Sequence, residues 1–227
     1  AETTAAATEA ETEATESAAE ESSAEETKAA ADIETVTPGK LTVATSPDFA
    51  PYEFYAIGED GTPKLAGFDM DLAQYIADYL GLELEVVTVD FDGVISELQT
   101  KSVDLGMAGL SPDEKRMGIM DFSDLYYMGG QSLVTVKDNA EKYNSFEAIN
   151  KPDVSVGAQV GSIQMDLANE NSPEADIVGL PKVTDIISEL LTGKMDAAYI
   201  ETDVAKSYQK NYPELTLVMD VPYDAEG

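Results

Sequence analysis

The 227-residue chain contains no cysteine and no histidine. Without cysteine there can be no disulfide, thiolate metal site or cysteine nucleophile. Without histidine the chain lacks the commonest general base and transition-metal ligand, so a Ser-His-Asp hydrolase cannot be assembled. No apolar run approaches a membrane span, and the N-terminus has no basic-then-apolar export signal. We therefore expect either a cytoplasmic protein or a processed form whose export signal has been removed.

Basic residues are scarce, because 13 lysines and arginines stand against 45 acidic residues, which gives a formal net charge of −32. Nucleic acid and anionic membrane surfaces are poor electrostatic partners for such a chain. Apolar residues make up 43% and charged residues 26%, as in ordinary soluble globular proteins. The length allows two modest lobes or one large domain.

The N-terminal segment consists almost entirely of Ala, Glu, Thr and Ser, and Ile33 is the one large apolar residue in its first 34 positions. Such a segment cannot bury enough surface to offset its conformational entropy. We predict a disordered acidic spacer over residues 1–36. It serves either as a tether that holds the folded body away from an anchor or as a solvated tail without function.

From Thr37 onward, short apolar strands alternate with amphipathic helices. We predict a helix that Asp69 caps and Gly81 ends, with Asp69 and its neighbour Asp71 in capping and dipole roles rather than as metal ligands. The alternation predicts an α/β fold with a mostly parallel sheet covered by helices, in which ligands bind at the carboxyl ends of the strands. The predicted strands are 41–45, 82–89, 103–108, 131–136, 154–158, 177–180 and 195–201.

The sequence ISELQTKSVD at 95–104 is similar to ISELLTGKMD at 187–196. Each reads as a short helix that turns into a buried strand, so we predict two lobes of related architecture. Chance similarity at a helix–strand junction is the alternative.

A candidate anion site follows the strand predicted at 103–108. Ser111 has the sequence pattern of a helix N-cap, and Arg116 lies one turn inside that predicted helix. Helix-start N–H groups and a fork-shaped guanidinium both favour a planar carboxylate. Alternatively, Ser111 merely caps the helix and Arg116 pairs with a surface acid.

Further candidates fall at other strand ends. Phe49 and Phe91 either fill the core or line the mouth of a site. The helix predicted to start at Ser162 offers N–H groups at Ser162 and Ile163, and Glu201 places an acid at a strand end. A cation site, an anion site and apolar faces together fit a zwitterion, so we predict a free amino acid as the ligand.

These motifs, in this order, resemble the extracytoplasmic solute-binding proteins of polar amino-acid ABC transporters, bacterial solute-binding protein family 3. Within that family, the chain resembles the glutamine-binding members. The resemblance covers most of residues 40–222. It is carried by Phe49-Ala50-Pro51-Tyr52, Gly67-Phe68-Asp69-Met70-Asp71, Asp90-Phe91, the stretches 98–104 and 108–116, Asp121-Phe122-Ser123 with Tyr126-Tyr127, and Gly161-Ser162.

The resemblance implies a type II periplasmic-binding-protein fold with lobe 1 over 37–132, lobe 2 over 133–222 and the ligand in the cleft between them. Residues 223–227 would begin a return to lobe 1. The rest of the family's C-terminal segment is not present, so we expect a truncated chain whose first lobe is less stable.

The resemblance also implies roles for the site residues. Arg116 would bind the ligand α-carboxylate, helped by the N–H groups of Ser111 and Ile163. The Gly109 carbonyl, the Ser111 hydroxyl and the Glu201 carboxylate would bind the α-ammonium group. The remaining implied site residues would surround the ligand side chain or complete the site: Ser46, Phe49, Phe91, Ala108, Gln159, Ser162 and Gln164.

Two departures from the family pattern bear on specificity. Many relatives have Asp where this chain has Ser46, so an uncharged polar amino acid such as glutamine becomes the expected ligand. Glu201 replaces a commoner Asp and reaches one methylene further.

By the same resemblance, ligand binding would close the two lobes about a hinge at 131–136 and 221–224, and a membrane permease would recognise the closed form. We expect a monomeric, non-enzymatic protein without cofactor or metal, exported and anchored as a lipoprotein. A dehydratase of prephenate-like acids and a sensory ligand-binding module of a receptor are the alternatives.

Overall fold

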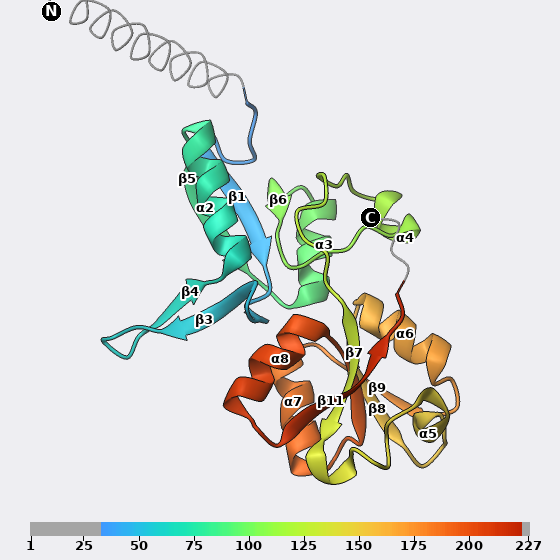
Figure 1. Ribbon diagram of the computed structural model, residues 1–227. Coiled ribbons are helices and arrows are strands. Elements are labelled where there is room, and N and C mark those ends of the chain that lie inside the picture. The colour runs from blue at the N-terminus through green and yellow to red at the C-terminus, as the bar shows by residue number, and fades with distance from the viewer. Residues whose placement is uncertain (1–32, 224–227) are drawn as a thin grey trace, which may run out of the picture.

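A computed structural model of the chain describes residues 33–223 (Figure 1). Most of the predicted spacer, and residues 224–227 of the predicted return segment, lie outside the described residues. The described chain forms two α/β lobes, as expected from the alternation of strands and helices. Lobe 1 contains β1 (Lys40–Thr45), β2 (Asp48–Phe49), β3 (Glu53–Ile57), β4 (Pro63–Ala66), α2 (Phe68–Leu80), β5 (Glu83–Thr88), α3 (Phe91–Gln99), β6 (Leu105–Gly106) and α4 (Glu114–Met117).

The main sheet of lobe 1 is parallel and has the order β5-β1-β6. Strand β1 is its centre and is buried on both faces. Leu41 and Val43 pack with the apolar side of α2, whereas Ala44 packs with Phe91 and Val94 of α3. The apolar run of β1 therefore reflects two covered faces.

A second, antiparallel sheet of lobe 1 has the order β2-β3-β4. Its β3–β4 hairpin projects away from the rest of the molecule in Figure 1. This sheet was not predicted from the sequence. Its hairpin strands are short and largely exposed, with only Glu53 of β3 fully buried, so they lack the apolar pattern of a core strand.

Lobe 2 is built on a five-stranded mixed sheet of order β11-β7-β10-β8-β9. Strands β10, β8 and β9 are mutually parallel, and β7 is antiparallel to both β10 and β11. Helices α7 and α8 cover one face, and α5 and α6 cover the other. Its elements are β7 (Gln131–Val136), η2 (Lys137–Asn139), α5 (Phe146–Ile149), β8 (Ser155–Gln159), α6 (Ile163–Asn171), β9 (Asp176–Leu180), α7 (Val183–Thr192), β10 (Ala197–Glu201), α8 (Thr202–Asn211) and β11 (Leu215–Val221).

The chain enters and leaves the lobe 2 sheet at one place. Gln131, the first residue of β7, is in register with Val221, the last residue of β11, and with Glu201, the last residue of β10. The boundary predicted between residues 132 and 133 falls inside β7. This strand belongs to the lobe 2 sheet and starts at Gln131.

The two similar sequence segments have the same structure. In each, a helix (α3 or α7) leads through a turn into a strand (β6 or β10). In each, the final aspartate binds the start of a neighbouring strand. Asp104 accepts a hydrogen bond from Thr42 N–H at 2.8 Å, and Asp196 accepts one from Ser155 N–H at 3.0 Å. This shared contact supports the related architecture of the lobes.

Several predicted element ends were wrong. Strand β6 has only two residues. Helix α4 starts later than predicted and is capped by Asp113, which accepts a hydrogen bond from Arg116 N–H at 2.8 Å, so Ser111 is not its N-cap. Gly67, not Asp69, is the N-cap of α2, because the Asp69 carboxylate is bonded elsewhere. Gly81 ends α2 in the left-handed conformation as predicted.

Candidate functional site

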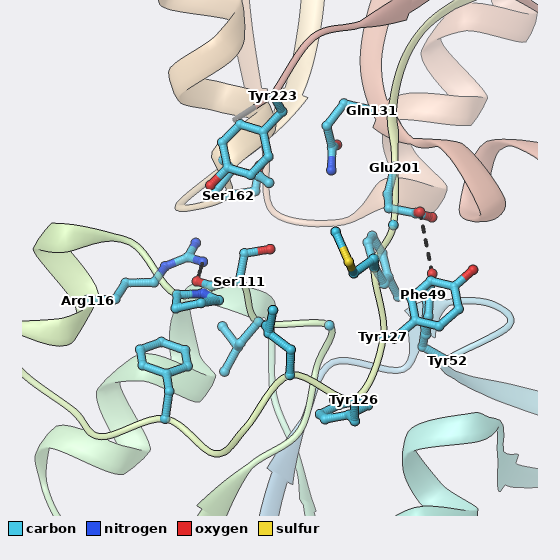
Figure 2. Close-up of a pocket in the computed structure, with 18 of the residues that line it drawn as sticks. Phe49, Tyr52, Ser111, Arg116, Tyr126, Tyr127, Gln131, Ser162, Glu201 and Tyr223 are labelled. Carbon is cyan, nitrogen blue, oxygen red and sulfur yellow. Dashed lines mark hydrogen bonds between the residues drawn. The ribbon is translucent and has the colours of Figure 1, made fainter. Parts of the chain in front are cut away.

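A pocket lies between the two lobes and contains ten of the twelve predicted site residues. Figure 2 shows Arg116 and Ser111 on one side of it and Glu201 with Tyr52 on the other. The lining consists of Phe49, Tyr52, Phe91, Gly109, Leu110, Ser111, Pro112, Arg116, Phe122, Ser123, Asp124, Leu125, Tyr126, Tyr127, Met128, Gly129, Gln131, Gln159, Ser162, Ile163, Gln164, Glu201 and Tyr223.

Arg116 is 6% exposed, and neighbouring groups hold its guanidinium in place. It donates to Ser111 O at 2.8 Å and, across the lobes, to Gly161 O at 2.9 Å. Its Nε lies 3.2 Å from a carboxylate oxygen of Asp113, and the guanidinium carbon is 5.7 Å from the centre of the Phe91 ring. Burial lowers the pKa of Arg116, and the Asp113 charge opposes this shift. The group stays charged at neutral pH and presents a planar cation to the pocket.

Glu201 is also 6% exposed, and it comes from lobe 2. One carboxylate oxygen caps α8 by accepting a hydrogen bond from Val204 N–H at 2.7 Å. The other lies 3.4 Å from the hydroxyl of Tyr52, a lobe 1 residue. Burial raises the pKa of Glu201, and the Val204 hydrogen bond opposes this shift. Burial and the Glu201 charge also raise the pKa of Tyr52, so its hydroxyl stays protonated and donates to Glu201.

The start of α6 lies at the pocket as predicted, but one of its two amides is already engaged. Ser162 caps the helix through its hydroxyl, and its own N–H donates to Gln159 O at 3.3 Å. The Gln159 side chain donates to Pro181 O at 3.1 Å, and the Gln164 side chain donates to the Gln131 side chain at 2.7 Å. These hydrogen bonds hold the Gln159 and Gln164 side chains in fixed orientations at the pocket.

Gly109 adopts φ +58°, and a side chain there would lie 2.9 Å from a ring carbon of Phe49. Only glycine fits this turn without strain. Its N–H donates to Asp69 at 3.1 Å. The two remaining predicted residues do not line the pocket. Ser46 is buried against Asp48, and Ala108 packs in the core beside α3.

The sequence analysis missed a wall of the pocket formed by residues 122–129, together with Tyr52, Gln131 and Tyr223. This wall lies between α4 and β7, where the described chain forms no helix or strand and therefore gives no periodic signal. Tyr126 and Tyr127 carried the family resemblance without being assigned to the site. Tyr127 donates a hydrogen bond to Asp203 of α8, and its ring contacts Tyr52 edge-on.

Within residues 33–223, no group of three or more His, Cys, Asp or Glu side chains is placed to hold a metal ion. No helix in the same part of the chain is long and apolar enough to cross a membrane. The ionisable residues of the pocket are Arg116, Asp124, Glu201 and several tyrosines. This set can hold a small ligand that carries both charges.

Two α/β lobes around a shared pocket are the arrangement of the type II periplasmic-binding-protein class. The profile of "Bacterial extracellular solute-binding proteins, family 3" matches residues 41–217. The chain belongs to this family.

Similar proteins are known by sequence and by structure. The arginine-binding extracellular protein ArtP of Bacillus subtilis is 35% identical over 178 residues, which cover 78% of this chain and 66% of the relative. The chain thus spans slightly less than two thirds of that relative's length. The amino-acid ABC transporter substrate-binding protein AbpA of Streptococcus pneumoniae, in a structure with L-arginine, is 37% identical at a TM-score of 0.76, covering 79% of this chain and 75% of AbpA.

One relative is an enzyme. The cyclohexadienyl dehydratase of Pseudomonas aeruginosa is 29% identical over 180 residues, which cover 79% of this chain and 66% of the enzyme. The fold and family therefore include both binding proteins and at least one catalyst.

Proposed function

We propose that the protein captures a free amino acid between its lobes and delivers it to the membrane permease of an ABC transporter. The observation that carries this proposal is that Arg116 and Glu201, of opposite charge, line the same pocket from different lobes. An amino acid carries a carboxylate and an ammonium group a few ångströms apart, and it can therefore join the two sides. Family membership and the arginine-bound relatives support the same proposal.

In this proposal the α-carboxylate binds Arg116 and the α-ammonium binds Glu201. The carboxylate replaces the carbonyl partners of the guanidinium, Ser111 O and Gly161 O, with charge-assisted bonds. Each such bond contributes about 1.5–3 kcal/mol. A micromolar dissociation constant corresponds to about 8 kcal/mol, so two ionic contacts and aromatic burial are sufficient after ordering costs.

A ligand that contacts both lobes binds more tightly when the lobes are closed than when they are separated. It therefore shifts the population toward the closed form. The permease would then recognise the closed form. The protein acts, in this proposal, outside the cytoplasm as a monomer. The acidic spacer would connect it to a lipid anchor.

The side chain of the ligand has two candidate classes. An uncharged polar amino acid such as glutamine was expected because Ser46 replaces an acid, and that preference stays a prediction. Ser46 does not line the pocket, however, whereas Asp124 does. Aromatic walls and the net charge of −32 also favour a cation. A basic amino acid such as arginine, which the AbpA structure contains, is therefore the second candidate.

Calorimetric titration with the free L-amino acids tests the proposal. We expect saturable binding of L-arginine or L-glutamine, and loss of at least about a hundredfold in affinity for Arg116→Ala. Lys64→Ala is the control, because Lys64 is an exposed cation of the same lobe in the β3–β4 hairpin. Unchanged binding by Arg116→Ala would exclude the carboxylate assignment.

The same samples separate binding from catalysis. We expect the protein to leave L-arginine, L-glutamine and prephenate chemically unchanged on prolonged incubation, as measured by mass spectrometry. Conversion of prephenate to phenylpyruvate would favour the dehydratase alternative, which the Pseudomonas relative supports.

A further inference from the structure

Two buried carboxyl groups lie behind the pocket in lobe 1 and have no role in the proposed function. Glu53 of β3 and Asp69 of α2 are both 0% exposed. A backbone hydrogen bond brings their segments together: Asp69 N–H donates at 2.9 Å to the carbonyl oxygen of Tyr52, the residue before Glu53. A buried carboxyl group is costly unless it is bonded or neutral.

The two groups differ in their hydrogen bonds. The Asp69 carboxylate accepts from Gly109 N–H at 3.1 Å with one oxygen and from the Tyr126 hydroxyl at 3.0 Å with the other. Both partners line the ligand pocket. Neither carboxyl oxygen of Glu53 meets a hydrogen-bond donor among the described residues, and its side chain lies against that of Asp69. Burial raises the pKa of Asp69, but donors on both oxygens oppose this shift and favour its ionised form, whereas Glu53 has no such donors.

Among residues 33–223, no lysine or arginine charge offsets the burial of Glu53 or Asp69. The charged or titratable groups that face Glu53 are Asp69 from α2, Asp48 from β2 and Tyr126 from the wall between α4 and β7. Burial raises the pKa of Glu53 well above its ordinary value, and the Asp69 charge, a hydrogen bond with the Asp69 side chain and the Asp48 charge add to this shift. Two adjacent carboxyl groups in a dry interior cannot both stay ionised. A protonated Glu53 has one donor, and Asp69 retains acceptor capacity.

We propose that Glu53 stays protonated and donates to Asp69, and that this carboxyl–carboxylate pair positions Gly109 and Tyr126 in the pocket. Neither acid touches the ligand. Asp69 fixes the turn at Gly109, whose carbonyl is expected to meet the ammonium group, and it fixes one aromatic wall (Figure 2). The positioning role rests on the proposed function and is measured as amino-acid affinity. The protonation of Glu53 is measured separately, as the stability of the protein.

Titration with L-arginine and L-glutamine tests the positioning. Asp69→Asn places an amide where two donors already converge, so we expect at least about tenfold weaker binding. Asp71→Asn, an exposed acid in the same helical turn, is the matched control and should change affinity by less than about twofold. Glu53→Gln keeps a side-chain donor toward Asp69, so its amino-acid affinity should also stay within about twofold of that of wild type.

The protonation is tested by urea unfolding at several pH values. The unfolded chain releases the Glu53 proton above about pH 4.5, the ordinary value, whereas the folded chain retains it. The free energy of unfolding therefore falls as the pH rises from there toward the raised pKa of Glu53. Glu53→Gln has no proton to lose, so its stability should fall less steeply with pH than that of wild type.

The outcomes are distinct. Wild-type affinity in Asp69→Asn, or about tenfold weaker binding in Glu53→Gln, overturns the positioning role. Equal pH slopes for wild type and Glu53→Gln overturn the shared proton. If Asp69→Asn does not fold, Tyr126→Phe tests the same contact with one bond removed, and undiminished affinity in that variant overturns the role at Tyr126. If wild type binds none of the free L-amino acids, the proposed function fails, whereas the unfolding slopes still decide whether Glu53 is protonated.

Discussion

Arg116 and Glu201 carry opposite charges in the pocket, but they respond differently to pH. The guanidinium keeps its charge at any pH at which the protein is folded. The Glu201 carboxylate is buried against Tyr52 and the start of α8, and burial raises its pKa. Of the two charges, acidification therefore removes only that of Glu201.

We expect amino-acid affinity to fall as the pH drops through the raised pKa of Glu201. Protonation removes the partner of the ligand ammonium group, so affinity should decrease by up to about tenfold per pH unit. Calorimetry between about pH 4.5 and 7.5 measures this loss. Glu201→Gln should bind weakly throughout and show a flatter profile. Glu170→Gln, an exposed acid on α6, is the control, and an unchanged profile in Glu201→Gln would contradict the ammonium assignment.

At the scale of single elements, α6 brings the lobe 2 backbone to the pocket. Its N-cap Ser162 accepts a hydrogen bond from Met165 N–H at 3.3 Å and donates to Gln159 O at 2.7 Å. The first bond satisfies a helix-start amide, and the second fixes the turn that follows β8.

Removing this cap should destabilise the protein. We expect Ser162→Ala to lower the free energy of unfolding by about 1 kcal/mol, measured by circular dichroism in urea. Ser188→Ala is the control, since Ser188 is exposed within α7 and alanine has the better helix propensity. A Ser162→Ala protein as stable as wild type would show that the cap contributes nothing.

Elements with a strong apolar pattern could be predicted from the sequence. Strand β7 was predicted with its observed bounds, and the repeated helix–strand junctions lie where expected. The β2-β3-β4 sheet and α8 could not be predicted, because the hairpin is largely exposed and α8 (Thr202–Asn211) is mostly polar. Helix caps were misplaced where a carboxylate was bound by distant residues, as Asp69 is by Gly109 and Tyr126.

The same limit applies to the site. Arg116 and Glu201 were found because each follows a recognisable strand or helix start. The tyrosine wall was missed because its position depends on tertiary contacts such as Tyr126 with Asp69 and Tyr127 with Asp203. Ser46 was included by resemblance, yet its side chain faces Asp48 instead of the pocket.

At the scale of the whole molecule, the lobes also touch away from the pocket. Asp48 of β2 accepts a hydrogen bond from Val183 N–H at the start of α7, at 2.5 Å. Its backbone carbonyl accepts one from the Tyr208 hydroxyl of α8 at 2.7 Å. These bonds exist only when the lobes are together, so they favour closure without contacting a ligand.

Asp48→Ala should therefore weaken amino-acid binding indirectly. Loss of one charge-assisted bond would shift the closed–separated equilibrium by about tenfold or more, and apparent affinity would fall by up to that factor. Calorimetry measures the affinity, and small-angle X-ray scattering measures the separation of the lobes. Asp60→Ala, in the exposed hairpin turn, is the control. Wild-type affinity in Asp48→Ala would show that this contact does not influence closure.

The register at the entrance of lobe 2 has a mechanical consequence. Gln131 lies beside both Val221 and Glu201, so the acid of the pocket sits next to the strand through which the chain enters the lobe 2 sheet. In a rotation about that entrance, atomic displacement grows with distance from the axis. Glu201 would then move less than the β3–β4 hairpin, which projects away from the rest of the molecule (Figure 1). A small angular change at the ligand would thus become a large translation at the periphery of the molecule.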